Sequence, residues 1–222
     1  LFAAYDALPS GDPLRTKLAA PVARLRGWDH RWSAASTTTS LAVLWGEAMW
    51  RLTADRVTAR GLGRYDGMVT ATSAREKLDA LAGAIDRLTA DFGSAEVPWG
   101  EINRFQRVDG AIEQRFDDAK PSIPVPFTSA QWGSLASFGA KRWPGTKRRY
   151  GTLGNSFVAV VAFGKDGPEA RAVSAGGESG NPASRHFNDQ AARYAAGDLR
   201  PVYFTPESLK GHVARVYRPG EK

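Results

Sequence analysis

The spacing of apolar residues changes once along this chain, and the change restricts the folds available to it. Before residue 93 the apolar side chains recur at intervals of three and four residues, which is typical of amphipathic helices. Residues 156–163 form a continuous run of β-favouring residues, long enough for one strand. Helices followed by strands, without βαβ alternation, predict an α+β fold with a helical first half and a β-hairpin in the second half.

Three helices are predicted in the helical half from their stripes and caps. The first ends at Gly27, and the second begins in the Ser/Thr run at 36–40. The third is the best defined, because Ser73 and Glu76 have the spacing of a capping box and Gly93 follows the last apolar residue. The stripes consist of Leu14, Leu18, Val22 and Leu25; Leu41, Leu44, Trp45, Ala48 and Leu52; and Leu78, Leu81, Ile85, Leu88 and Phe92.

A hairpin is predicted directly after the strand-like run. Residues 164–167, Gly-Lys-Asp-Gly, supply a tight turn, and residues 170–175 return as the partner strand. The elements expected next are a glycine-rich loop at 176–181, a helix at 189–196, a short strand at 201–204 and a last helix started by Thr205 and Pro206.

No linker divides the chain persuasively, so we expect a single segment over residues 1–222. Residues 1–96 are expected to be mainly helical, 97–148 irregular because prolines and single aromatics interrupt any pattern, and 149–222 strand-rich with terminal helices. The longest apolar stretch, 41–50, is far short of the roughly 20 residues that a membrane span requires. The chain does not begin with Met, which suggests a processed subunit or a fragment.

Composition excludes some sites and leaves one alternative open. Cysteine is absent, which rules out disulfides and thiolate zinc sites within the chain. The formal charge is +7, and its densest basic cluster surrounds Trp143. That cluster consists of Lys141, Arg142, Lys147, Arg148 and Arg149. Basic residues interleaved with an aromatic could track a phosphate backbone, whereas Pro144-Gly145 indicates an ordinary solvated turn.

Two of the histidines invite a functional hypothesis. His186 followed by Asp189 could indicate metal ligation, a general base with its orienting carboxylate, or a histidine that hydrogen-bonds within a loop. We favour the loop interpretation, because no His-x-x-x-His pair accompanies it and a metal site usually needs three ligands. His30 lies beside Asp29 and two tryptophans in a helix-to-helix turn, where packing and capping explain it.

The Gly177-Glu178-Ser179-Gly180 segment resembles a nucleophile elbow only superficially. The elbow requires glycine two positions after the serine, and that position is Asn181. A phosphate loop starting at Gly176 would need Gly-Lys-Ser/Thr, which does not follow. We therefore interpret the loop as a backbone turn whose glycines need positive φ. The seven tryptophans would suit an apolar pocket or a large core.

Several segments, in the same order along the chain, resemble the signature of the penicillin amidase family. They are Leu-Arg-Gly-Trp-Asp at 25–29, Pro-Trp-Gly-Glu-Ile-Asn-Arg at 98–104, the run from Tyr150 to Val161, the loop from Gly176 to Gln190, and Arg-Pro-Val at 200–202. The Phe-Val-Ala-Val-Val strand and the Asn-Pro-Ala-Ser loop are most similar to acyl-homoserine lactone acylases and to aculeacin-type and cephalosporin-type acylases. The chain thus resembles the C-terminal part of the family's large subunit.

The resemblance implies an N-terminal-nucleophile hydrolase with an αββα sandwich. Its precursor would be exported to the periplasm and cut into a small and a large subunit, and the serine that begins the large subunit would attack the amide with its own amino group as base. The expected substrate is a small N-acyl compound: an acyl-homoserine lactone, a lipopeptide or a β-lactam side chain. The expected partners are the rest of the large subunit and the small subunit, with no nucleic acid.

The residues of the reaction are expected outside this chain. We therefore expect no catalytic, cofactor-binding or metal-binding residue within residues 1–222, while the resemblance leaves room for a structural calcium in the full protein. Some family members place a glutamate near the end of the Phe-Val-Ala-Val-Val strand, where this chain has Ala162. Even if the alignment slips by a residue or two, Glu169 is too far along the chain to be matched to that position. That departure keeps a catalytically silent binding or structural protein as the alternative.

Overall fold

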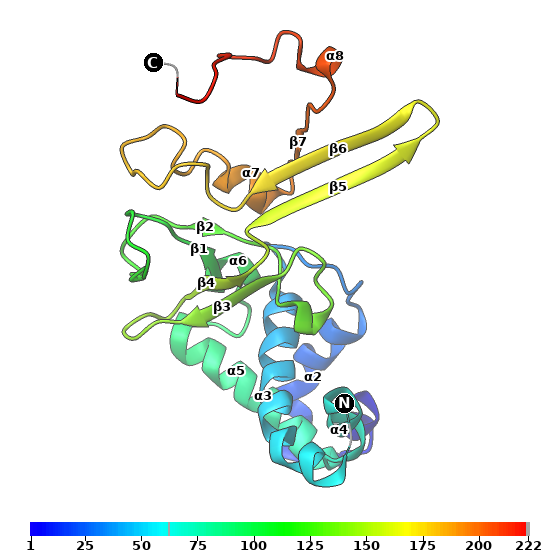
Figure 1. Ribbon diagram of the computed structural model, residues 1–222. Coiled ribbons are helices and arrows are strands. Elements are labelled where there is room, and N and C mark those ends of the chain that lie inside the picture. Colours follow the sequence, from blue (N-terminus) through cyan, green and yellow to red (C-terminus); the bar gives the residue numbers. More distant parts are fainter. Residues whose placement is uncertain (62, 221–222) are drawn as a thin grey trace. The chain divides into compact units, whose positions relative to one another are not determined.

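The computed structural model describes residues 1–61 and 63–220 and divides the chain into two compact units, Leu1–Gly154 and Asn155–Lys222. Helices occupy the beginning of the first unit, and each unit contains its own β-sheet (Figure 1). The mixture of helices and sheets without βαβ alternation confirms the α+β class.

The first unit is built on packed helices. They are α1 (Phe2–Asp6), α2 (Pro13–Arg26), α3 (Thr37–Arg60), α4 (Arg64–Thr70) and α5 (Ala74–Phe92). Helices α2, α3 and α5 pack on one another, and their predicted stripes meet in one hydrophobic core (Figure 1). Leu18, Leu41, Leu81 and Leu88 in that core are fully buried. Burial of such side chains stabilises the fold by about 1.5–3 kcal/mol each.

The helix ends lie where the sequence places them. The Ser36 hydroxyl accepts a hydrogen bond from the Thr39 amide at the start of α3. Ser73 and Glu76 form the predicted capping box of α5, which ends at Gly93 with φ of 78°. Such caps satisfy amide groups that the helix leaves unpaired, and each stabilises its helix by about 1 kcal/mol.

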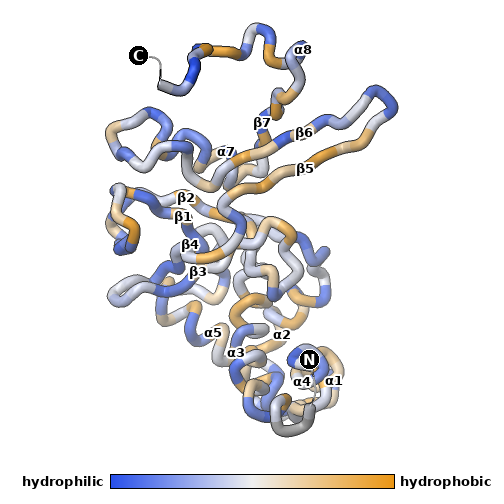
Figure 2. The backbone as a smooth tube through the Cα atoms, in the orientation of Figure 1, coloured by the Kyte–Doolittle hydropathy of each residue, from blue (hydrophilic) through white to orange (hydrophobic). Residues whose placement is uncertain are grey.

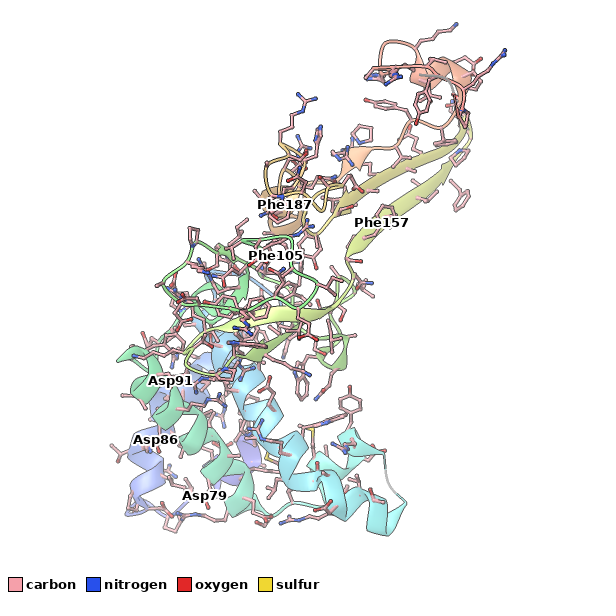
Figure 3. All side chains as sticks on the ribbon, turned by 60° about the vertical axis from the view of Figure 1, so that its left-hand side comes forward. Asp79, Asp86, Asp91, Phe105, Phe157 and Phe187 are labelled. Carbon is pink, nitrogen blue, oxygen red and sulfur yellow. The ribbon has the colours of Figure 1, made fainter. Side chains whose placement is uncertain are left out.

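The polar side of α5 carries acidic residues that form ion pairs with basic side chains. Figure 3 labels Asp79, Asp86 and Asp91 along this helix. Asp86 pairs with Lys17 of α2 at 2.6 Å, and Asp91 pairs with Arg142 at 3.0 Å. The helix therefore combines a buried apolar stripe with a charged outer side.

Residues 97–148 were expected to be irregular, and most of them are, although short elements that were not predicted occur among them. They contain α6 (Trp99–Ile102), β1 (Asn103–Phe105), β2 (Ile123–Pro124), a 3-10 turn (Ala130–Trp132) and β3 (Phe138–Arg142). With β4 (Arg149–Gly154) the strands form a sheet in the order β2-β1-β4-β3, in which β1 runs parallel to β4. These strands are short and pair with distant segments, so no local alternation of polar and apolar residues predicts them.

The second unit contains the predicted hairpin. Strand β5 (Phe157–Gly164) pairs antiparallel with β6 (Gly167–Ser174), and β6 pairs with the short β7 (Arg200–Pro201). Helices α7 (Ala191–Ala196) and α8 (Pro206–Leu209) complete the unit. The partner strand begins three residues earlier than expected, because Gly167 with φ of 113° makes the turn tight enough for Pro168 and Glu169 to pair. The strand expected at 201–204 is reduced to Arg200–Pro201.

Candidate functional site

The loop that follows β6 is organised around the buried side chain of Gln190. Its Oε1 accepts hydrogen bonds from the Ser174 amide and from Nε of Arg200, both at 3.1 Å. Its Nε2 donates to Glu178 at 3.0 Å, and its backbone N–H donates to the carbonyl of Gly176 at 2.9 Å. One amide side chain thus joins the end of β6, the loop, the start of α7 and β7.

Glu178 is used by the same network. The Ser174 hydroxyl donates to its Oε1 at 2.6 Å, and this bond, followed by the one from Gln190, lowers the pKa of the Glu178 carboxyl. A carboxylate that is ionised and already hydrogen-bonded is poorly suited to act as a general acid near neutral pH. Its arrangement is that of a structural group.

His186 and Asp189 are brought together, as the sequence suggested. Nδ1 of His186 lies 2.7 Å from Oδ2 of Asp189, and Nε2 accepts a hydrogen bond from Nε of Arg185 at 3.0 Å. The bond from His186 is also the main reason why the pKa of Asp189 is lowered. Both ring nitrogens are occupied by neighbours within the loop, which is the arrangement that the loop-hydrogen-bond interpretation predicts.

The glycines of this loop serve a different purpose from the one predicted. None of Gly176, Gly177 and Gly180 has positive φ in the structure, so that expectation is wrong. Gly177 is required by close approach, because a Cβ there would collide with the carbonyl oxygen of His186. Ser179 takes part in the turn, since its Oγ accepts a hydrogen bond from the Asn181 amide at 3.1 Å.

A separate apolar cavity lies in the first unit. It has a volume of about 420 Å³ and is lined by residues from the helices, the turn between α2 and α3, and Trp132. His30 lies at its wall, 5.2 Å from the ring of Trp28, and is the non-glycine residue with positive φ, 60°, among the described residues. The contact with Trp28 agrees with the expected packing, although His30 itself is exposed. The tryptophans divide between the two predicted roles: Trp28, Trp32, Trp45 and Trp132 line the cavity, whereas Trp99 belongs to the core.

Much of the basic cluster is neutralised by acidic residues. Arg149 makes a two-pronged contact with Glu47, with N–O distances of 2.6 and 2.9 Å, although 102 positions separate the two residues. Arg142 pairs with Asp91, and Arg148 pairs with Glu101 at 3.6 Å. Residues 144 and 145 form the predicted turn. Paired guanidinium groups do not form a continuous phosphate track, so nucleic-acid binding loses its main support.

The Glu47–Arg149 pair was missed by sequence reasoning. Its partners come from α3 and β4, and the side chain of Arg149 is only 8% exposed. Neither residue lies in an unusual local sequence pattern. The pair can therefore be found only from the packing of β4 against the helices.

The hairpin register bears on the position held by Ala162. Ala162 lies directly opposite Glu169, and side chains of opposed residues project from the same face of a sheet, with Cβ atoms about 4.5–5.5 Å apart. Glu169 is therefore close to Ala162 in space, although it is too far along the chain to be matched to that position by a small shift of the alignment. A separation of seven positions in sequence is no guide to distance across a tight hairpin.

Two further properties concern the described residues alone. They contain no group of three or more His, Cys, Asp or Glu side chains placed to hold a metal ion. In the same ranges, none of the helices combines the length and hydropathy that crossing a bilayer demands.

Comparisons with known proteins match segments in both units. A family model described as penicillin amidase matches residues 2–211. An acyl-homoserine lactone acylase of Pseudomonas fluorescens is 29% identical over 167 residues, which cover 73% of this chain and 19% of that protein. A protein of the same description from Pseudomonas syringae pv. tomato is 28% identical over 135 residues, 61% of this chain and 16% of its own length. The chain thus spans less than a fifth of these relatives.

Proposed function

Because the chain belongs to the penicillin amidase family, we propose that it is the C-terminal part of the large subunit of an acylase. The whole protein would hydrolyse the amide bond of a small N-acyl compound and would have the αββα sandwich of N-terminal-nucleophile hydrolases. The observation that carries the proposal is the family match over residues 2–211, which includes both units and the loop around Gln190.

The catalytic groups of this acylase are assigned to the part of the protein outside the chain. A serine at the start of the large subunit would attack the amide, with its own amino group as base, and backbone and asparagine donors would stabilise the oxyanion. The occupied side chains of the Gln190 loop support this assignment. Glu178 is held by Ser174 and Gln190, and both nitrogens of His186 are engaged.

Acyl-homoserine lactones are the proposed substrates, because the relatives of this chain are described as acylases for those compounds. Lipopeptides and β-lactam side chains are the second choice. The precursor would be exported to the periplasm and cut into two subunits, and the other subunit and the rest of the large subunit would be the partners.

The test is an assay of the complete, processed protein. Release of fatty acid from dodecanoyl-homoserine lactone, and loss of that release when the first serine of the large subunit is replaced by alanine, is the expected result. Residues 1–222 alone should release none, and turnover by this chain alone would show that the catalytic groups are misplaced. Penicillin G in parallel distinguishes the two substrate classes.

A catalytically silent family member is the second candidate, and Ala162 is the observation that favours it. An intact fold without turnover of either substrate would support it. Glu169 allows a finer test in an active protein, because it lies opposite Ala162. If Glu169 takes over the role of the family's glutamate, Glu169→Gln should reduce kcat and change its pH profile, whereas the exposed Glu207→Gln should leave both unchanged.

A further inference from the structure

The apolar cavity of the first unit has the size of a small-molecule site. Its volume of about 420 Å³ lies within the range of roughly 300–1,000 Å³ that is common for ligand pockets. Ala42, Trp45 and Gly46 are three and four positions apart on α3, so one face of that helix forms a wall. Figure 2 shows hydrophobic stretches along both α2 and α3, and the turn between these helices supplies another wall.

The indole N–H groups of two tryptophans in the lining are already used by the protein. Nε1 of Trp45 donates to the carbonyl of Lys77 at 3.0 Å, and Nε1 of Trp28 donates to the carbonyl of Arg31 at 3.3 Å. Each bond fixes the orientation of its ring. Because the N–H groups are engaged, these rings offer a ligand aromatic hydrocarbon surface and no hydrogen bond.

Trp132 completes the aromatic wall because α3 has a glycine opposite it. A Cβ at Gly46 would lie 3.1 Å from the Trp132 ring, so the ring rests closely on the helix. Trp50 contacts the same ring edge-on, with 5.9 Å between centroids, and Gly133 with φ of 83° ends the 3-10 turn that carries Trp132. A wall held in this way exists before a ligand arrives, which reduces the entropic cost of binding.

His30 supplies a polar group at the wall of the cavity. Its φ of 60° is uncommon for a residue other than glycine, and such outliers occur preferentially at functional sites. The side chain is exposed, and its imidazole nitrogens have no hydrogen-bond partner in the part of the chain that the structure describes. A neutral imidazole has one nitrogen that donates and one that accepts, so His30 can bind one polar group of a ligand.

The charges around the cavity favour an anionic ligand over a cationic one. The residues that line the cavity include no aspartate and no glutamate, so a cation would meet no opposite charge there. Arg31 follows His30 in the turn, and its guanidinium is 87% exposed and 4.0 Å from the carboxylate of Asp29. A ligand carboxylate at His30 would thus have a mobile cation beside it.

We propose that this cavity binds a planar aromatic carboxylate of one or two rings, with the rings among the tryptophans and the carboxylate at His30. Aromatic rings gain from edge-to-face and offset contacts with tryptophan, which a saturated ring of similar size lacks. The proposal does not depend on the amide hydrolysis proposed above, because it rests on the lining of the cavity alone.

The occupancy of the cavity is tested on the complete, processed protein by titration calorimetry with cinnamate. Ala42→Leu should weaken the binding of cinnamate by about tenfold or more, because the larger side chain fills part of the cavity. Ala54→Leu is the matched control: it is also half-buried on α3 but does not line the cavity, and binding should be unchanged. Absence of binding by the unaltered protein, or equal binding by both variants, would overturn the proposal.

The class of ligand is tested with two analogues of cinnamate. Cyclohexanepropionate, which has a saturated ring, should bind several-fold more weakly, and equal or tighter binding would overturn the assignment to aromatic compounds. Cinnamyl alcohol lacks the carboxylate. His30→Asn, a residue that tolerates positive φ, should weaken the binding of cinnamate about tenfold and leave that of cinnamyl alcohol unchanged. An equal effect on both ligands would overturn the placement of the carboxylate.

Hydrolysis of dodecanoyl-homoserine lactone by the same samples separates this proposal from the proposed function. Binding of cinnamate that responds to Ala42→Leu, without hydrolysis, would refute the acylase alone. Hydrolysis without such binding would refute the aromatic site alone. Competitive displacement of cinnamate by dodecanoyl-homoserine lactone would assign the cavity to the acyl substrate and would also overturn the proposal.

Discussion

Single residues of the Gln190 loop are fixed by contacts that their neighbours in sequence only partly reveal. The sequence singled out the loop from 176 to 190 by its resemblance to a family signature, and the His186–Asp189 contact was anticipated from the spacing. The reason for glycine at position 177 was not anticipated, because the backbone there approaches the carbonyl of His186, nine positions later. Sequence reasoning finds residues that interact within a turn more readily than a backbone that must pass beside another backbone.

Gly177 provides a direct test of that close approach. Gly177→Ala should destabilise the protein by about 1–3 kcal/mol, because the new Cβ and the His186 carbonyl cannot both keep their positions. Gly180→Ala is the matched control, since a Cβ there would meet no heavy atom within 4 Å. Urea unfolding of both variants measures the difference, and equal stabilities would show that the loop is more open than described.

The ionisation of Glu76 makes the stability of the helical unit depend on pH in the acidic range. The hydrogen bond from Arg56, followed by those from Ser73, lowers the pKa of the Glu76 carboxyl from 4.5 to about 2. A lowered folded-state pKa stabilises the protein above the unfolded value, and the contribution is lost as the pH falls from about 4.5 toward about 2. Glu76→Gln should therefore lower the Tm at pH 7 and matter less near pH 2, whereas Asp79→Asn should have a small effect throughout. A Tm difference that grows on acidification would contradict this.

At the scale of elements, the helices and the hairpin could be predicted, and the first sheet could not. Caps such as Ser73 with Glu76, and apolar stripes such as that of α5, are local signals. The β5–β6 turn is equally local. Strand β1 instead pairs in parallel with β4, Asn103 opposite Arg149, across a separation that no periodicity encodes. The Glu47–Arg149 contact depends on the same long-range packing and was missed for the same reason.

This contact should be one of the stronger polar links between α3 and the sheet. Glu47→Gln leaves the guanidinium of Arg149, whose side chain is 8% exposed, without its charged partner. Loss of one member of a well-buried pair costs about 3–5 kcal/mol, and the 26% exposure of Glu47 places the expected loss near the lower end. Asp86→Asn, which breaks the exposed pair with Lys17, should cost under about 1 kcal/mol. Similar losses in the free energy of unfolding would contradict this ranking.

At the scale of the whole molecule, the two units differ in the size of their hydrophobic cores. The principal hydrophobic cluster draws its buried residues from Leu14 to Ile102, all in the first unit. The second unit buries far fewer large apolar side chains, chiefly Val173, Phe187 and Tyr194, and leaves β5 exposed on both faces. The sequence predicted one segment because no linker is visible. The division into two compact units depends on contacts between residues, which the sequence pattern does not show.

Unequal cores lead to unequal autonomy. Residues 1–154 produced alone should retain a cooperative thermal transition and the helical circular dichroism of α2, α3 and α5, because their core lies within that range. Residues 155–222 alone should lack a cooperative transition, since chains below about 70–80 residues seldom supply enough core without added constraints. A two-state transition for the shorter piece would show that its few buried residues suffice.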